Sequence, residues 1–322
     1  MSQFQEDFIN PSDPQVIEKR LIAKYEFYYR QLTMTSGGGG MHIDKLEKEV
    51  LLYNASMRAY DRQMREHNTV ALRKLGGLTR LQSLNTRSVH HDSHDLGPIV
   101  AKSWQIGLDK KPPPREIFAK KIHNLITPTE AEELVRISEA IGYRCFVRNI
   151  PETTTARSKP EPARTHTACT VHSDELALWL WQRIGPLVCG VSREYASRIW
   201  SPSGINPCMR FSRYAEGQLF ETHIDDIHEK FDRRPPERSF FTVVLYLNQG
   251  FDNGSLRFVT SRVTDRIAAE SPERVVHSIA PAAGLGMVFQ HDLLHEACPP
   301  TGNIPKYILR TDVVFTSSGA AM

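Results

Sequence analysis

Apolar residues recur at helical spacing in two segments near the start of the chain. In residues 15–33 the apolar positions are mostly three or four residues apart, which predicts a helix. Residues 43–64 repeat a regular a/d stripe through Ile43, Leu46, Val50, Tyr53, Met57, Tyr60 and Met64. The glycines at 37–40 form a flexible connector. We expect a helical hairpin, packed either on its own chain or, as a coiled coil, on a second copy through residues 43–64.

A run of prolines at residues 112–114 interrupts the pattern, so we expect a domain boundary there. The boundary separates an N-terminal helical region, residues 1–110, from a second domain, residues 115–318.

Two helices are predicted in the second domain. Thr127 and Glu130 have the spacing of a capping box, with proline between them at the first helical position. They predict a helix over residues 128–141. Another helix is predicted over about residues 173–183, with Asp174 as its N-cap.

From residue 206 onward, short β-branched and aromatic runs alternate with turn residues. Many short strands with turns between them are typical of a β-sandwich or barrel. The predicted strands are residues 209–214, 240–247, 256–259, 275–279, 287–290 and 307–315.

Composition indicates which partners and which cellular compartment to expect. The 40 basic residues are nearly balanced by 37 acidic ones, and the net charge of +3 does not favour nucleic acid or a membrane as a partner. No apolar stretch is long enough for a membrane span, and the first residues lack the pattern of a secretory signal. Five scattered cysteines indicate reduced thiols. We therefore expect a cytoplasmic or nuclear protein that is not secreted.

The pattern His-x-Asp occurs four times, with its histidine at positions 42, 90, 172 and 223. The first three lie in the a/d helix, in a polar histidine-rich stretch and at a helix start. Only His223 and Asp225 lie in strand-like surroundings, where residues two apart point to the same side of the strand. They can therefore bind one metal ion together.

A third ligand is expected from a distant strand. His291 and His295 both precede the last predicted strand, and we favour His295. Together with His223 and Asp225 it gives two histidines and one carboxylate, which leave three positions on the metal open. This set is typical of non-haem Fe(II) oxygen chemistry.

The last predicted strand also carries two cations on one face, Lys306 and Arg310. A cation in a half-buried strand is costly unless it has a partner. Either residue could bind the distal carboxylate of 2-oxoglutarate, the cosubstrate of many such iron enzymes. The alternative for each is a structural ion pair with an acid of the barrel.

Several blocks in this half of the chain follow a recognisable order. Residues 209–225 fit R-Y-x-x-G-x-x-F-x-x-H-x-D, and residues 242–248 fit T-x-x-x-Y-L-N. Residues 252–258 are similar to G-G-x-x-x-F. Residues 295–299 follow and contain the candidate third ligand, His295. Residues 306–312 come next and form the strand with the two cations. In this order the blocks resemble those of the prolyl 4-hydroxylase-like Fe(II)- and 2-oxoglutarate-dependent oxygenases.

The resemblance implies a fold and a set of cofactors. It implies an α+β chain with a double-stranded β-helix (a jelly-roll, cupin-like fold) over about residues 206–316, with supporting helices beside the N-terminal hairpin. It also implies Fe(II) and 2-oxoglutarate, with ascorbate as a further option, and Fe(II) would lie at His223, Asp225 and His295.

The resemblance also implies a cosubstrate site. Tyr214 and Tyr246 would hydrogen-bond the cosubstrate carboxylate, and the alternative for both is a core tyrosine with a satisfied hydroxyl. Lys306 aligns with the usual cationic position of the family, and Arg310 stays its rival.

The implied activity is hydroxylation of a C–H bond by O2, with succinate and CO2 as co-products and no catalytic residue beyond the metal site. We expect a protein side chain as substrate, with proline a candidate. The alternatives are a small molecule or nucleobase as substrate, or a scaffold protein that works through the N-terminal hairpin. Two features depart from the family: Asn253 replaces the first glycine of its turn, and the polar tract 228–238 is either a lid or a solvated loop.

Overall fold

The computed structural model describes residues 66–73, 79, 81, 92–104, 116–145, 164–230, 235–261 and 274–317. The chain divides into two units, Met1–His67 and Asn68–Met322, and the elements discussed below belong to the second. The predicted hairpin, and with it the dimer through residues 43–64, lies outside the described residues.

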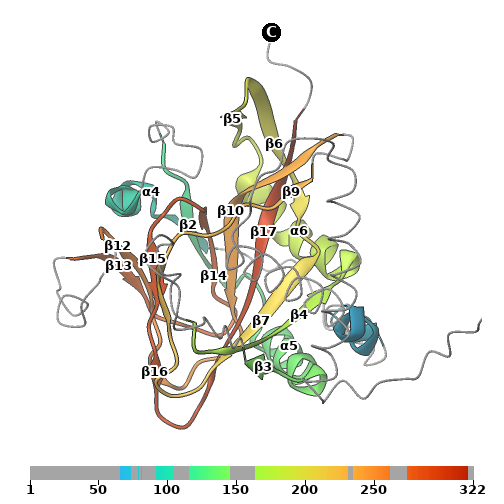
Figure 1. Ribbon diagram of the computed structural model, residues 1–322, viewed down its shortest axis with the longest axis vertical. Helices are drawn as coiled ribbons and strands as arrows, with labels where there is room; N and C mark the ends of the chain where they lie inside the picture. Colours follow the sequence, from blue (N-terminus) through green and yellow to red (C-terminus); the bar gives the residue numbers. More distant parts are fainter. Residues whose placement is uncertain are drawn as a thin grey trace, which may run out of the picture. The chain divides into compact units, whose positions relative to one another are not determined.

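Two antiparallel sheets form the body of the second unit (Figure 1). The larger has the order β1-β2-β14-β10-β17-β7-β4-β3, with β9 beside β10 and the hairpin β5–β6 beside β17. Its strands are β1 (Asp92–Asp95), β2 (Ala119–His123), β3 (Arg144–Cys145), β4 (Thr167–His172), β5 (Arg193–Tyr195), β6 (Arg198–Ile205), β7 (Cys208–Tyr214), β9 (Glu229–Lys230), β10 (Glu237–Tyr246), β14 (Gly286–Gln290) and β17 (Lys306–Ser317).

The smaller sheet lies against one face of the larger and has the order β13-β12-β15-β8. Its strands are β8 (Phe220–His223), β12 (Leu256–Val259), β13 (Val275–Ile279) and β15 (His295–Ala297), and β11 (Asp252–Asn253) pairs separately with β16 (Pro300–Thr301). All strand pairs among the described residues are antiparallel. The fold is therefore the predicted double-stranded β-helix.

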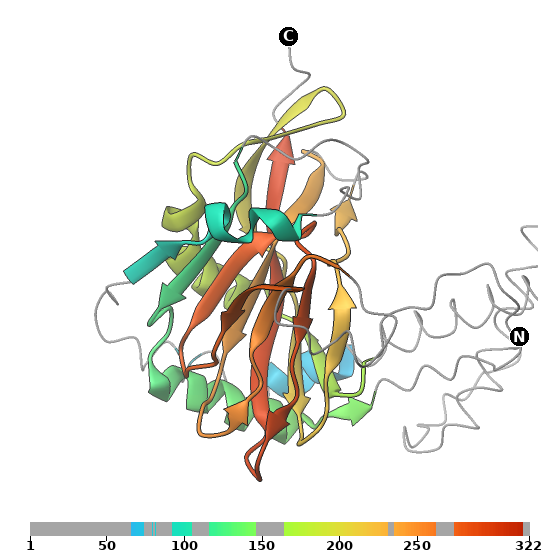
Figure 2. The same cartoon turned by 90° about the vertical axis from the view of Figure 1, so that its left-hand side faces the viewer.

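Helices cover the other face of the larger sheet (Figures 1 and 2). Helix α5 (Pro128–Ile141) starts with the predicted capping box, since Thr127 accepts from the backbone of Glu130 and the Glu130 carboxylate accepts from the backbone of Thr127. Helix α6 (Asp174–Val188) follows β4. Short α4 (Gly97–Val100) lies beside β2, and the 3-10 turn η1 (Ala101–Ser103) that follows it contacts β12.

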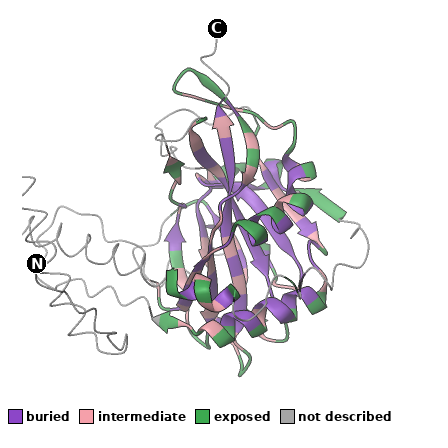
Figure 3. Cartoon of the chain, turned by 90° about the vertical axis from the view of Figure 1, so that its right-hand side faces the viewer, coloured by how far each residue is buried: buried purple, intermediate pink, exposed green. Residues whose placement is uncertain are grey.

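The two-residue period of strand β17 separates an apolar face from a polar one. Leu309 and Val313 pack into the core that the larger sheet shares with α5 and α6. Lys306, Ile308 and Arg310 point the other way, into the space between the sheets. Strands β7 and β10 alternate in the same manner, so the cavity is lined by every second residue of three central strands. Figure 3 shows how completely these strands are buried.

The six predicted strands are all present, with bounds shifted by at most three residues. The N-cap of α6 was predicted wrongly: the side chain of Ser173 accepts from the backbone of Leu176, and Asp174 is the first helical residue. Strands β2 and β4 were not foreseen. The division at residues 110–115 stays a prediction, although the described stretch 92–104 joins the larger sheet through β1.

The two departures from the family pattern have local explanations. Asn253 and Gly254 have φ angles of 58° and 70°. Asparagine tolerates the left-handed region better than other residues with a side chain, so it can replace glycine in this turn. In the tract 228–238, β9 pairs with β10, and Arg238 is buried over the ring of Tyr195 and paired with Glu229. Those described parts of the tract belong to the sheet.

Two broader expectations concern thiols and membranes. The four cysteines whose side chains are described, Cys169, Cys189, Cys208 and Cys298, are free thiols, as expected. Within the described ranges, the helices are too short or too polar to cross a membrane.

Gly284 offers a test of close backbone packing. Its φ is +82°, and a Cβ atom would lie 2.2 Å from the carbonyl oxygen of Ile126. Gly142 has a similar φ of +91° but open space around it. We expect Gly142→Ala to lower the free energy of unfolding by about 1 to 2 kcal/mol through backbone strain. Gly284→Ala should cost about 2 kcal/mol more, because the helix start must move. Urea denaturation measures both, and equal losses would contradict the packing argument.

Candidate metal and cosubstrate site

Strand pairing brings two histidines together across the smaller sheet. His223 is the last residue of β8 and His295 is the first of β15, and the two are direct partners in the antiparallel register. Their ring centroids are 4.3 Å apart. The predicted third ligand is therefore found opposite the first, although many residues separate them in sequence.

Asp225 lies just past the end of β8, in the segment that follows the strand. Its backbone N–H donates to the carbonyl of His291, at 3.1 Å. Its two carboxylate oxygens lie 3.8 Å from Nε2 of His223 and 3.5 Å from Nε2 of His295. One ligand atom from each of the three residues lies within 4.8 Å of the others. One ion at roughly 2 Å from each atom can be shared by all three.

Backbone carbonyls fix which nitrogen each imidazole offers. Nδ1 of His223 lies 2.7 Å from the carbonyl of Glu221, and Nδ1 of His295 lies 2.8 Å from that of Leu293. A carbonyl only accepts, so each Nδ1 carries the proton and each Nε2 presents a lone pair. Burial, reinforced by His295, lowers the pKa of His223 and keeps it neutral.

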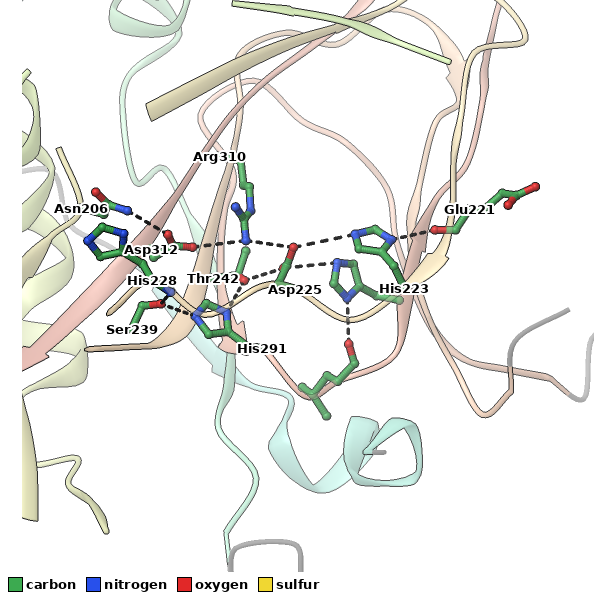
Figure 4. A network of polar contacts seen from close by, with 12 residues as sticks. Asn206, Glu221, His223, Asp225, His228, Ser239, Thr242, His291, Arg310 and Asp312 are labelled. Atoms are coloured by element: carbon green, nitrogen blue, oxygen red, sulfur yellow. Dashed lines mark hydrogen bonds and ion pairs between the residues drawn. The ribbon is translucent and has the colours of Figure 1, made fainter. Parts of the chain in front are cut away.

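Asp225 is held by two donors behind the metal position (Figure 4). The hydroxyl of Thr242 donates to its Oδ2 at 2.5 Å, and Arg310 Nη2 lies 2.9 Å from its Oδ1. Burial alone would raise the pKa of Asp225, but the charge of Arg310, together with His295 and His223, outweighs burial and holds it well below its usual range. The carboxylate is therefore ionised, as a metal ligand must be.

His291, the alternative ligand, lies behind the site and not in it. Its Nδ1 lies 2.8 Å from the Thr242 hydroxyl, and its Nε2 lies 2.9 Å from the hydroxyl of Ser239. Burial lowers its pKa to about 4, so the ring is neutral. Because the Thr242 hydroxyl donates to Asp225, it must accept from Nδ1 of His291. His291 therefore orients Thr242, which in turn orients the metal-binding carboxylate.

The two cations of β17 have different partners. Arg310 forms ion pairs with Asp225 and Asp312, the latter at 3.3 Å. Lys306 is buried, and its ammonium donates to the backbone carbonyls of Gly254 and Cys298 at 2.9 and 3.0 Å. In the described part of the chain no carboxylate pairs with Lys306, and burial lowers its pKa to about 7. Lys306 is thus the cation that still needs an anion.

Tyr214 and Tyr246 line the same cavity as Lys306. The ammonium lies 4.2 Å from the ring centroid of Tyr214. Burial raises the pKa of both phenols, so both stay protonated donors. Neither hydroxyl makes a hydrogen bond to another described residue, although buried hydroxyls normally have one. The ammonium and the two hydroxyls form a set of donors that fits a carboxylate.

The cavity is also lined by residues that the sequence analysis did not select as site candidates. Besides the seven predicted residues, its lining includes Thr242 and Phe220, whose ring stacks on His223 with centroids 3.5 Å apart. It also includes Arg164, His166 and Arg210. Phe220 belongs to the R-Y-x-x-G-x-x-F block and Thr242 opens the T-x-x-x-Y-L-N block, but no motif pointed to Arg164, His166 or Arg210.

Comparison with known proteins agrees with this geometry. Residues 209–311 match the family model described as the 2OG-Fe(II) oxygenase superfamily. The matched range begins in β7 and ends in β17, and it contains all seven predicted site residues. No curated protein matches the chain.

Solved structures with partial similarity include three prolyl hydroxylases. A viral collagen prolyl hydroxylase from Paramecium Bursaria Chlorella virus-1, in complex with 2-oxoglutarate, has 15% identity and a TM-score of 0.36, covering 65% of this chain and 99% of its own. A Pseudomonas putida prolyl-4-hydroxylase has 18% identity and a TM-score of 0.37, covering 62% and 93%. A Trichoplax adhaerens prolyl hydroxylase with a hypoxia inducible factor peptide has 16% identity and a TM-score of 0.40, covering 62% and 83%.

The TM-scores and identities of these structures are too low to add to the functional assignment. The assignment depends on the match of residues 209–311 to the family model and on His223, Asp225 and His295. Two imidazole Nε2 atoms and an ionised carboxylate on one side of a buried position fit Fe(II). The chain resembles the prolyl 4-hydroxylase-like oxygenases and is a 2-oxoglutarate-dependent dioxygenase with hydroxylase chemistry. Its cofactor is Fe(II), and its cosubstrates are 2-oxoglutarate and O2.

Thr242→Val tests whether the hydroxyl behind Asp225 supports metal binding. Valine keeps the shape but removes the donor to the carboxylate and the acceptor for His291. We expect Fe(II) affinity to fall about 10- to 100-fold, the usual effect of losing a partner of a metal ligand. Anaerobic titration against a chelator measures it.

Thr311→Val is the matched control. Its hydroxyl is equally buried and donates to the carbonyl of Asn206 at 2.7 Å, away from the ligands. Both variants should lose similar stability, about 1 kcal/mol each, and only the first should lose iron affinity. An equal loss of affinity in both variants would refute the specific role of Thr242.

Proposed function

We propose that the protein hydroxylates a protein side chain, with proline as the candidate target, and that His223, Asp225 and His295 hold the iron. The observation that carries the proposal is the convergence of these three ligands beside Lys306, a buried cation without a carboxylate partner in the described residues. The resemblance of residues 209–225 to prolyl 4-hydroxylase-like enzymes supports the choice of substrate.

The residues of the chain prepare the metal site in three ways. The carbonyls of Glu221 and Leu293 keep the histidine protons on Nδ1, and Thr242 and Arg310 keep Asp225 ionised and oriented. Apolar side chains, among them Phe220, Val244 and Leu256, line part of the cavity and limit the entry of water. When bound, Fe(II) and 2-oxoglutarate supply the activation of O2 that hydroxylates a C–H bond, with succinate and CO2 as co-products.

Lys306, Tyr214 and Tyr246 are proposed to bind the distal carboxylate of 2-oxoglutarate. The lysine supplies the charge and the tyrosines supply hydroxyl donors. Arg310 is assigned a different role, because its guanidinium already pairs with Asp225 and Asp312. It holds the metal ligand, which is the structural ion pair that the sequence left open as the alternative.

A scaffold function for this domain is disfavoured by the same geometry. A domain that had lost turnover would not need a buried lysine without an acidic partner among the described residues, or a buried ionised Asp225 beside two histidines, since each arrangement costs stability. A small molecule or nucleobase remains the competing substrate.

Removal of a ligand tests the chemistry directly. With Fe(II) and O2, wild-type protein should convert 2-oxoglutarate to succinate, and His223→Ala should reduce this turnover at least a hundredfold by breaking the ligand set. Succinate is quantified by mass spectrometry. His277→Ala, in β13 and outside the cavity, is the control and should keep wild-type turnover. Equal turnover in wild type and His223→Ala would refute the assignment.

The pKa of Lys306 predicts how 2-oxoglutarate binding depends on pH. Its pKa of about 7 means that the ammonium loses its proton as the pH rises through 7, and a neutral amine does not attract a carboxylate. The neighbouring groups do not titrate there, since burial raises the pKa values of Cys298 and Tyr214 and lowers that of His166 to about 3. The Kd for 2-oxoglutarate should therefore rise about tenfold per pH unit above 7.

Lys306→Arg supplies the comparison, because arginine keeps its charge over this range. Its Kd should be higher at pH 7, since the geometry differs, but flat between pH 7 and 9. Anaerobic calorimetry with the Fe(II)-loaded protein measures both curves. A flat wild-type curve would remove Lys306 from the carboxylate site.

A further inference from the structure

The two strands that carry the histidine ligands share a short and irregular ladder. Strands β8 and β15 are paired at His223 with His295 and at Phe220 with Ala297, and the register shifts between these two pairs. Between them β8 has two residues and β15 has one. Such a bulge disrupts the hydrogen bonds of the ladder and increases the local twist. The ladder alone therefore gives weak control over the spacing of the two histidines.

Polar side chains join the same two strands on the face turned away from the cavity. Thr222 precedes His223, and Glu296 follows His295. Neighbours along a strand point to opposite faces, and neither Thr222 nor Glu296 lines the cavity. The hydroxyl of Thr222 donates to Oε2 of Glu296 at 2.8 Å. This hydrogen bond crosses from β8 to β15 directly behind the histidine pair.

Arg274, which precedes β13, closes this contact into a ring of three side chains. Its Nη2 donates to Oε2 of Glu296 at 2.7 Å, and its Nη1 donates to the hydroxyl of Thr222 at 3.3 Å. Nη1 also donates to the carbonyl of Ser261 at 3.2 Å, and the carbonyl of Arg274 accepts from the N–H of Thr260. One guanidinium thus connects both ligand strands to the end of β12.

These three side chains are largely shielded from water. The exposed fraction is 6% for Arg274, 8% for Thr222 and 13% for Glu296. Solvent and salt screen a buried ion pair much less than a surface pair. The hydroxyl of Thr222 lies between the two charges, so it accepts from the guanidinium and donates to the carboxylate. Each member of the ring therefore has a fixed direction of hydrogen bonding.

The position of Thr222 also affects how the first imidazole is oriented. Glu221 and Thr222 are the two residues of the bulge, and the carbonyl of Glu221 accepts from Nδ1 of His223 at 2.7 Å. A shift of Thr222 would carry this carbonyl with it. The direction of Nε2 of His223 and its distance from His295 would both change.

We propose that Thr222, Glu296 and Arg274 are positioning residues that form a clamp, which fixes the spacing of His223 and His295 for the metal. The proposal rests on the proposed iron ligands and adds three residues that do not touch the metal. A metal ion needs ligand distances within about 0.2 Å of its preferred values. A clamp that prevents small movements of the two strands therefore increases metal affinity.

Binding of Co(II) alone measures this effect without turnover. Co(II) accepts the same nitrogen ligands as Fe(II), and its visible absorption depends on ligand geometry. Competition with a chelator gives its Kd. Thr222→Val and Glu296→Gln should each raise the Kd about tenfold, as expected when a support of a metal ligand is lost, and should shift the visible bands. Wild-type Kd and bands in both variants would overturn the proposal.

Glu130→Gln is the matched control. Glu130 and Arg183 form another buried ion pair at 2.7 Å, which joins α5 to α6 on the far side of the larger sheet. The variant loses the same charge from a buried pair, so urea denaturation should show a comparable loss of stability. Its Co(II) Kd and bands should stay at wild-type values. An equal rise in Kd in Glu130→Gln would attribute the effect to general destabilisation and refute the clamp.

Two further variants of the clamp test its hydrogen bonds. Thr222→Ser keeps the hydroxyl and should restore the wild-type Kd and bands that Thr222→Val loses. Arg274→Met should raise the Kd about tenfold, whereas Arg274→Lys keeps the charge and should lie between Arg274→Met and wild type. A wild-type Kd in Arg274→Met would remove Arg274 from the clamp. A Kd in Thr222→Ser as high as in Thr222→Val would show that the hydroxyl has no role.

A double variant tests whether the clamp acts as a unit. Residues in one hydrogen-bond network have effects that are not additive. Thr222→Val combined with Glu296→Gln should therefore raise the Kd no more than either change alone. An additive loss of affinity, about a hundredfold, would contradict a single clamp.

His223→Ala separates the clamp from the ligand assignment. If this variant weakens Co(II) binding about a hundredfold while the clamp variants bind like wild type, only the clamp is refuted. If His223→Ala binds Co(II) as tightly as wild type, the proposed ligands themselves are wrong.

Discussion

The site depends on one pairing, that of β8 with β15, which sets His223 directly opposite His295. A one-residue slip in this register would turn one imidazole to the far side of the sheet, because side chains alternate along a strand. Asp225 is held at the same site by a hydrogen bond from its backbone N–H to the carbonyl of His291. The three candidate ligands thus meet at the paired ends of two strands.

The central strands of the larger sheet also offset the cost of burying charged side chains inside the domain. One face of β7, β10 and β17 is apolar and packs on α5 and α6, whereas the other carries the polar lining. Each fully buried Leu or Phe on the apolar face contributes roughly 1.5 to 3 kcal/mol. Such burial offsets the cost of holding Lys306 and Arg310 in the interior, and Arg310 reduces its own cost by pairing with Asp225.

The sequence predicted the ligands because their chemistry and their spacing coincide. The two-residue spacing of His223 and Asp225 predicted one strand face, although β8 ends at His223 and Asp225 lies in the segment that follows, and the order of the blocks identified His295. It could not separate Lys306 from Arg310, since residues four apart on a strand have the same orientation and only their partners differ. Strand β2 was missed because Ala-Lys-Lys-Ile-His has too few apolar residues to show a period. The role of Thr242 follows from its contacts with Asp225 and His291, which lie in other segments of the chain, so no local pattern contains it.

The two cations of β17 face the same cavity but have different partners, which explains why one strand can carry both. Arg310 lies beside the carboxylate of Asp225, and its positive charge keeps that carboxylate ionised. Lys306 lies at the other end of the same polar face, opposite Tyr214 in the register, where backbone carbonyls and a ring are its only described partners. An exchange of the two residues would alter both places, because the planar guanidinium and the compact ammonium differ in length and in the directions of their N–H groups. The strand therefore carries both Lys306, the cation that we propose for the cosubstrate carboxylate, and Arg310, the cation that pairs with Asp225.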